Sequence, residues 1–279
     1  MNYDYPDKNL LEKRSEELGK EEKYYNLRKL IFQKDFNSKL LIPLGIDNYN
    51  EKYYIDLNDK SGLFISGETG SGKSIFLNDI IISLLLKNNP NELQLILVDS
   101  KNVEFNIYYE LPHLCKKEIT DINTSLIYLR DEINRRRQLF ASYNVKKIED
   151  YNSNVQELLS HLVLIIDETE LPDNCINHNE LIRDILSEGY KYGIHLILAT
   201  SSYLKDNYDS KLLNEFNYVI SFDQASEEQA KYLKIKKANL LSVYGEALIK
   251  QEDESLVNIQ VPYVSDKDIN EVVNFYKKD

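Results

Sequence analysis

The chain has 279 residues, of which 42% are hydrophobic and 29% are charged, a composition that fits a globular protein and excludes collagen-like and disordered chains. The sequence has no apolar run long enough to cross a bilayer and no apolar signal region near its start, so we expect a cytoplasmic protein without a membrane segment of its own. Its two cysteines, Cys115 and Cys175, are then expected to be reduced. The net charge of −12 argues mildly against nucleic acid as a partner, because a strongly acidic protein binds phosphate only through local basic patches.

The first part of the chain is expected to form a helical extension. Residues 8–35 are mixed in charge, with Leu and Tyr at helical spacing, which is typical of an exposed helix. The pattern then changes, and residues 40–57 alternate apolar and polar side chains around an Asp-Asn turn, which predicts a hairpin. We therefore place a domain boundary near Ser38, with the extension over 1–38 and one main domain over 39–279.

The main domain alternates short β-rich runs with helical stretches. Strands are expected at 63–66, 93–99, 162–167, 194–200 and 218–222. Their hydrophobicity is continuous, as strands buried on both faces require. Helical patterns occupy 73–87, 121–140, 180–192 and 226–234, and the tail is expected to form strands at 245–250 and 256–261 and a helix at 266–277. This rhythm predicts an α/β domain with a mostly parallel central sheet and helices on both of its faces.

The segment between the first of these strands and the first helix fits the phosphate-binding loop in every constrained position. Its residues are Gly67, Glu68, Thr69, Gly70, Ser71, Gly72, Lys73 and Ser74. The glycines permit the tight backbone in which successive N–H groups converge on anionic oxygens. Lys73 is expected to hold the β and γ phosphates of ATP, and the Ser74 hydroxyl to complete the coordination of Mg²⁺.

Two acidic residues at the end of the run LVLIID are expected to complete the site. Asp167 can reach the water shell of Mg²⁺ from the exit of a buried strand, and Glu168 can polarise the attacking water. Alone, such a pair is as often a helix cap, but the phosphate loop upstream favours the catalytic interpretation. Thr200 ends the next central strand, and its hydroxyl is a candidate sensor of the γ-phosphate.

Five segments carry a resemblance to a known family. They are GETGSGKS (67–74), VDSKNVEFNIYYELPHL (98–114), EINRRRQLF (132–140), LVLIIDE (162–168) and GIHLILAT (193–200). Together they resemble the motor domain of the FtsK/SpoIIIE family of hexameric DNA translocases, from about Leu30 to the C-terminus. The resemblance implies a RecA-like fold, ATP hydrolysis at the subunit interfaces of a homo-oligomeric ring, and double-stranded DNA in the central channel.

The sequence also departs from that family. After Thr200 the family usually has Gln-Arg-Pro, whereas residues 201–203 read Ser-Ser-Tyr, and no arginine occurs after Arg183. Ring ATPases of this type commonly receive a cation from the neighbouring subunit, the arginine finger. Arg183 and the run 135–137 are the better candidates for this catalytic role. We prefer Arg183, because its helix follows the Asp-Glu pair and the resemblance implies that this helix lies near a subunit boundary. A surface ion pair of Arg183 with Asp184 or Glu188 is the alternative.

Contacts to DNA would come from two groups of basic residues. The first group consists of Arg135, Arg136, Arg137, Lys146 and Lys147, and the second of Lys231, Lys234, Lys236 and Lys237. A solvated surface is the alternative explanation for either group.

Three functions remain open from the sequence. The leading hypothesis is an ATP-driven translocase that moves double-stranded DNA in partition, conjugation or plasmid maintenance. The second is a secretion-type ATPase that acts on protein substrates, which the acidic net charge favours modestly. The third is a module in which nucleotide binding controls assembly with little turnover.

Overall fold

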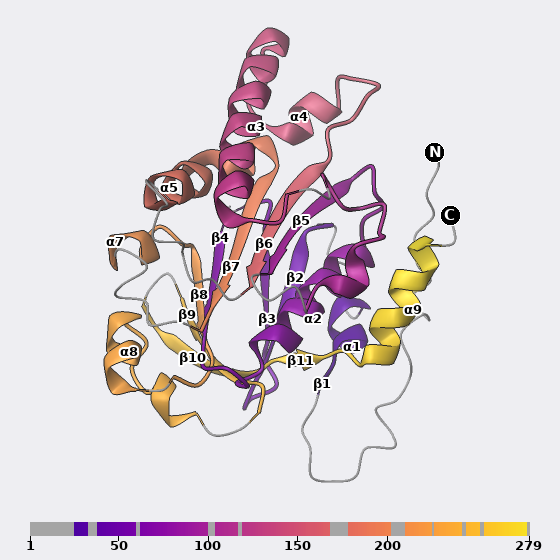
Figure 1. Cartoon of the computed structure of the whole chain (residues 1–279). Helices are drawn as coiled ribbons and strands as arrows, with labels where there is room; N and C mark the ends of the chain where they lie inside the picture. The colour runs from indigo at the N-terminus through magenta and orange to yellow at the C-terminus, as the bar shows by residue number, and fades with distance from the viewer. Residues whose placement is uncertain are drawn as a thin grey trace.

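The computed structural model describes residues 25–32, 38–59, 62–99, 104–116, 119–167, 178–201, 210–224, 226–241, 244–251 and 254–277. At its centre lies a nine-stranded sheet with the strand order β3-β2-β10-β9-β8-β4-β7-β6-β5 (Figure 1). Helices cover both faces of this sheet, as the sequence predicts.

Five neighbouring strands of the sheet are parallel. They are β4 (Gly62–Ser66), β5 (Leu93–Asp99), β6 (His161–Asp167), β7 (Ile194–Thr200) and β8 (Tyr218–Ser221). Each predicted strand is confirmed to within one residue at either end. The reason for their continuous hydrophobicity is visible in β4, where Leu63 and Ile65 enter one core and Phe64 enters the other.

Four antiparallel strands extend the sheet beyond β8. They are β9 (Glu246–Lys250), β10 (Leu256–Gln260), β2 (Leu41–Asp47) and β3 (Lys52–Asp56). The predicted hairpin and the predicted pair of tail strands are therefore both confirmed. They join the same sheet, because β10 pairs with β2, so the sheet is parallel in one half and antiparallel in the other.

One face of the sheet is covered by helices from the two ends of the chain and by the helix that follows β4. These are α1 (Leu27–Phe32), α2 (Lys73–Leu85), α9 (Asp266–Lys277) and the short 3-10 helix η1 (Asn106–Tyr108). In Figure 1 the three α-helices lie to the right of the sheet.

The other face carries the remaining helices. They are α3 (Ile122–Tyr143), α4 (Ile148–Asn152), α5 (His178–Glu188), α7 (Ser210–Leu213), α8 (Glu227–Tyr232) and the 3-10 helices η2 (Gly189–Tyr192) and η3 (Ala238–Leu240). The helix α3 begins where the Asp121 side chain accepts a hydrogen bond from the Thr124 N–H at 2.8 Å, and it projects past the end of the sheet together with α4 (Figure 1). No helix of the described ranges has both the length and the hydropathy that a membrane crossing requires.

The start of the described chain belongs to the packed domain. Leu27, Leu30 and Ile31 of α1 are buried, and β1 (Tyr25–Asn26) pairs in parallel with β11 (Pro262–Tyr263). The exposed extension that we expected up to Ser38 therefore does not include α1. Residues 1–24 and 33–37, which make up the rest of that prediction, lie outside the described residues.

Candidate nucleotide-binding site

The phosphate loop joins β4 to α2 and has the backbone that its glycines predict. Gly70 and Gly72 have φ angles of 84° and 111°, which side chains other than hydrogen rarely allow. Gly67 has a different constraint, because a Cβ at this position would lie 2.6 Å from Cβ of Phe222. Three of the loop positions therefore require glycine, two for the backbone angle and one for space.

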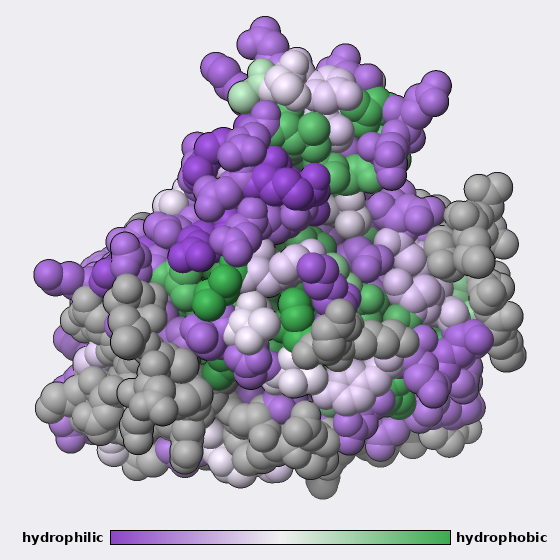
Figure 2. Space-filling view, turned by 45° about the horizontal axis from the view of Figure 1, so that its top comes forward, coloured by the Kyte–Doolittle hydropathy of each residue, from purple (hydrophilic) through white to green (hydrophobic). Residues whose placement is uncertain are grey.

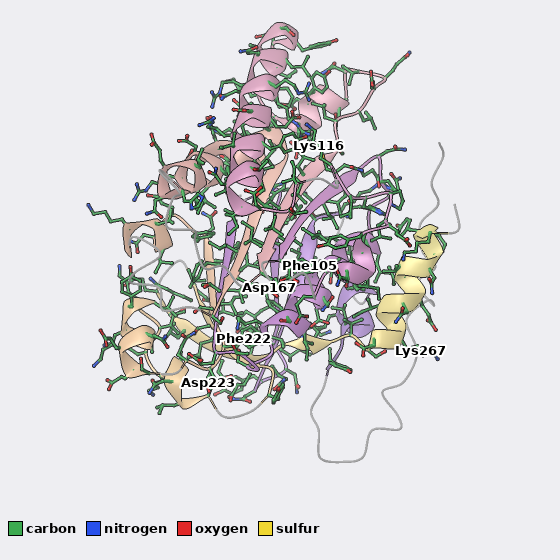
Figure 3. All side chains as sticks on the ribbon, in the orientation of Figure 1. Phe105, Lys116, Asp167, Phe222, Asp223 and Lys267 are labelled. Atoms are coloured by element: carbon green, nitrogen blue, oxygen red, sulfur yellow. The ribbon has the colours of Figure 1, made fainter. Side chains whose placement is uncertain are left out.

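Neighbouring strands hold this loop from behind. The Gly67 N–H donates to the Thr200 carbonyl at 3.3 Å, and the Glu68 N–H donates to the Asp223 carbonyl at 2.7 Å. The Lys73 ammonium is buried and donates to the carbonyls of Gly67 at 2.7 Å and of Glu68 at 2.9 Å. The loop is thus fixed by the ends of β7 and β8 and by its own lysine. Asp223 is labelled in Figure 3, below Asp167.

A cavity of about 220 Å³ opens on the outer side of the loop. Its lining residues are Thr69, Gly70, Gly72, Lys73, Ser74, Ile75, Asp99, Glu104, Asp167 and Tyr244. Five of the eight predicted loop residues line it. Gly67 and Glu68 instead hold Lys73 through their carbonyls, and the Ser71 N–H donates to the Glu68 carbonyl at 3.1 Å.

The predicted metal ligands lie next to each other in the lining of this cavity. The Ser74 hydroxyl lies 3.4 Å from Oδ2 of Asp167, and Asp167 is 1% exposed. The register between β5 and β6 places Asp99 beside Asp167 at the same edge of the sheet. Oδ2 of Asp99 accepts a hydrogen bond from the Glu104 N–H at 2.8 Å, which brings a third carboxylate to the cavity.

This donor set fits Mg²⁺. Hydroxyl and carboxylate oxygens are the ligands that Mg²⁺ prefers, and Mg²⁺ usually takes only one or two of them from the protein, with phosphates and water completing its shell. The described part of the chain has no cluster of three or more His, Cys, Asp or Glu side chains that would hold a metal ion alone. Ser74 and Asp167 would bind the ion together with a phosphate ligand.

Asp99, Glu104 and Tyr244 were not predicted as site residues. Asp99 carries the same signal as Asp167, an aspartate at the exit of a buried strand, and it lies near the start of a segment that resembles the family, but we attached no role to it. Glu104 stands in a segment that resembles the family, with no role attached. Tyr244 has no local signal, since its place depends on the pairing of β9 with β8.

The other predicted site residues have different outcomes. Glu168 follows β6 directly but lies outside the described residues, so its role stays a prediction. Thr200 is buried at the end of β7, and its carbonyl supports the loop. Arg183 is half-buried on α5 and does not line the cavity of its own chain. Its role toward a neighbouring subunit also stays a prediction.

The first group of basic residues needs one correction. Arg136, which we grouped with a DNA-facing patch, is 2% exposed, and its guanidinium donates at 2.7 Å to Glu132 and at 2.7 Å to the Tyr192 carbonyl. It is a core residue because it lies on the buried side of α3. Arg135 and Arg137 remain on the surface, paired with Glu132 and Glu188. The turned view in Figure 2 shows a mostly hydrophilic surface in the upper part of the molecule, where α3 lies.

The second group of basic residues lies on α8 and the segment after it. Lys231 pairs with Glu227 at 2.8 Å, and the Lys234 ammonium donates to Asn214 at 3.1 Å. Lys236 and Lys237 are exposed. This group is therefore accessible to a ligand, but part of its charge is already paired.

Comparison with known proteins identifies the family of the chain. The sequence model of the FtsK/SpoIIIE family matches residues 27–230. The chain is 33% identical over 260 residues to DNA translocase FtsK of Helicobacter pylori strain J99, and 33% identical over 267 residues to DNA translocase SftA of Bacillus subtilis strain 168. These alignments cover 88% and 90% of the chain but 30% and 28% of the relatives, so the chain spans less than a third of their length.

Solved structures with a similar fold include a secretion ATPase and a conjugation coupling protein. The cytoplasmic domain of the Thermomonospora curvata type VII secretion ATPase EccC has a TM-score of 0.73 and 23% identity, over 88% of this chain and 32% of that one. The pCW3 conjugation coupling protein TcpA has a TM-score of 0.70 and 24% identity, over 86% of this chain and 71% of that one. These likenesses show that the fold is that of a RecA-like P-loop NTPase. The family model, which matches most of the sequence, shows that the chain belongs to the FtsK/SpoIIIE family.

Proposed function

We propose that the protein is an ATP-hydrolysing motor that moves double-stranded DNA. The observation that carries the proposal is one cavity in which the phosphate loop, Lys73, Ser74 and Asp167 meet at the edge of the sheet, in a chain of this family. A conjugation coupling protein of similar fold has been solved with the ATP analogue ATPγS, which supports a nucleotide as the ligand of this chain.

In the proposed reaction the chain positions the nucleotide and a water molecule. The loop N–H groups and the Lys73 ammonium would bind the β and γ phosphates, and Ser74 and Asp167 would hold Mg²⁺. Mg²⁺, when bound, would neutralise part of the negative charge on the phosphate oxygens, including the charge that develops as the bond to the γ-phosphate breaks. Glu168 accepts a hydrogen bond from the attacking water and directs it at the γ-phosphate, and the Thr200 hydroxyl senses whether that phosphate is present.

The residues assigned to the phosphates can be tested one by one. Lys73→Ala should abolish ATP binding or turnover, because it removes the cation at the phosphates. Glu168→Gln should keep ATP binding and trap unhydrolysed ATP. Turnover of Glu168→Gln at the wild-type rate would remove Glu168 from the role of base.

We also propose that the motor works as a ring of identical subunits, most simply a hexamer, with Arg183 reaching the site of its neighbour. Mixing Lys73→Ala subunits with Arg183→Ala subunits should then restore some ATPase activity, because some interfaces would combine an intact loop with an intact arginine. Mixing each variant with itself is the control. Failure of rescue at every ratio, with assembly intact, would exclude Arg183 from the shared site.

The net charge of −12 favours one alternative, an ATPase that acts on protein substrates. ATPase activity measured with and without long duplex DNA, together with the molecular mass in the presence of ATP, separates the two. DNA stimulation with assembly supports the DNA motor, and assembly without any DNA response supports the alternative. ATP binding without turnover would contradict both.

A further inference from the structure

Two large apolar side chains are exposed at the nucleotide cavity. Tyr244 is 60% exposed and Ile75 is 36% exposed, and both line the cavity. Removing apolar surface from water is favourable, so a ligand that covers these two side chains binds more tightly than one that leaves them exposed. Tyr244 and Ile75 are not among the residues assigned above to phosphate or Mg²⁺.

The strand order separates Tyr244 from the carboxylates. The strand before the loop, β4, has β7, β6 and β5 on one side. Of these, β6 ends in Asp167 and β5 ends in Asp99. On the other side lie β8 and then β9. Because β9 is antiparallel to β8, the turn before β9, with Tyr244, comes to the same edge of the sheet. The metal-binding end of the cavity and the Tyr244 end are therefore on opposite sides of the loop.

The position of Tyr244 is fixed against the loop. Its hydroxyl lies 4.0 Å from where a Cβ of Gly70 would be, and the Gly245 N lies 3.6 Å from where a Cβ of Gly72 would be. The Gln260 side-chain amide donates to the Tyr244 carbonyl at 3.0 Å, and the Val261 N–H donates to the Gly245 carbonyl at 2.9 Å. The backbone of this turn is thus anchored to β10 and the residue that follows it, while the ring faces the cavity.

We propose that Tyr244 and Ile75 form the nucleobase subsite of this cavity. With the phosphates and Mg²⁺ at the carboxylate end, the base of a nucleoside triphosphate lies at the other end, against the Tyr244 ring and the Ile75 side chain. A planar base offers apolar faces to such contacts, and aromatic stacking depends little on which base is present. The inference rests on the proposed function and names the part of the ligand that Tyr244 and Ile75 bind.

The test compares two ligands that share the phosphates but not the base. Binding of ATP and of inorganic tripolyphosphate, each with Mg²⁺, is measured by titration calorimetry for the wild type and for Tyr244→Ala and Tyr244→Phe. Tyr244→Ala should weaken ATP binding roughly 5- to 100-fold, the range expected for loss of base stacking, and leave tripolyphosphate binding unchanged. Tyr244→Phe keeps the ring and should bind ATP like the wild type.

A matched control is Tyr49→Ala. Tyr49 is an exposed tyrosine in the turn between β2 and β3, and β2 lies two strands beyond β9 in the sheet, so this change should affect neither ligand. Equal losses of ATP and tripolyphosphate binding in Tyr244→Ala, or no loss of ATP binding, would overturn the subsite. A wild-type protein that binds neither ligand would instead overturn the proposed function.

Discussion

Replacing Arg136 by alanine should destabilise the fold. The Arg136 guanidinium is buried between the Glu132 carboxylate and the Tyr192 carbonyl, with both hydrogen bonds at 2.7 Å. Burial raises the pKa of Glu132, but the hydrogen bonds from Arg135 and Arg136 outweigh this and hold the pKa below its ordinary value. Arg136→Ala would therefore leave a buried carboxylate with one arginine fewer and a buried carbonyl without its donor.

The size of the loss follows from these contacts. Breaking a buried ion pair by removing one partner costs about 3–5 kcal/mol. Arg135 still donates to Glu132 at 2.7 Å, which offsets part of that cost, so we expect a loss of about 3 kcal/mol in the free energy of unfolding. In a domain of this size such a loss lowers the melting temperature by roughly 5–10 °C.

Urea unfolding followed by circular dichroism measures this loss directly. The matched control is Arg135→Ala, which removes a 54% exposed side chain from the same carboxylate and should cost less than about 1 kcal/mol. A variant Arg136→Ala that unfolds at the wild-type urea concentration but binds DNA more weakly would refute our correction. It would show that the arginine serves the ligand and not the fold.

Three further predictions concern the site and a buried carboxyl group. Removing Mg²⁺ with EDTA should weaken ATP binding more than about tenfold in calorimetry, because the Asp99 and Asp167 carboxylates repel an uncompensated triphosphate; equal affinities would contradict the metal assignment. Gly67→Ala should weaken ATP binding to a similar extent at unchanged helix content, because its Cβ would collide with Phe222. Asp79 is fully buried on α2, and burial raises its pKa well above the ordinary value, although the Val264 backbone N–H acts in the opposite direction. Its folded form therefore keeps a proton that the unfolded chain has lost, so stability falls as the pH rises above about 4 through the folded pKa. Asp79→Asn should raise stability at pH 8 by about 1–2 kcal/mol in urea unfolding and remove this part of the pH dependence, whereas a loss of stability at pH 8 would count against the assignment.

The parallel half of the fold was predictable because its signals are local. In a strand such as β4, Leu63 and Ile65 pack in one core and Phe64 packs in the other, so apolar residues are needed on both faces of the strand. The pairing of β10 with β2 has no such signal, since it joins segments from opposite ends of the chain. That pairing makes the sheet mixed, and the sequence alone did not indicate it.

The helix α3 held a signal that we did not use. Leu129, Ile133, Arg136 and Phe140 recur every three or four residues and are all buried. Arg136 lies on that stripe, while Arg135 and Arg137 flank it. Helical periodicity therefore separates one core arginine from two surface arginines in a run that reads as a single basic cluster.

The candidate site divides in the same way. Lys73, Ser74 and Asp167 were predictable, because a phosphate loop and an acidic strand exit are short patterns with a known chemistry. Tyr244 was not, because it reaches the loop only through the antiparallel addition of β9 to β8. The residues assigned to phosphate can thus be recognised from a local sequence motif. The residue assigned to the base reaches the site only through the pairing of strands that are distant in the sequence.

Movement along DNA is the central claim, and displacement of a third strand measures it most directly. A long duplex carrying a triplex-forming oligonucleotide is incubated with the protein, and release of the oligonucleotide is followed with and without ATP. We predict ATP-dependent release by the wild type and none by Lys73→Ala, with little preference among unrelated duplex sequences. A protein that hydrolyses ATP and assembles but never releases the oligonucleotide would contradict the account.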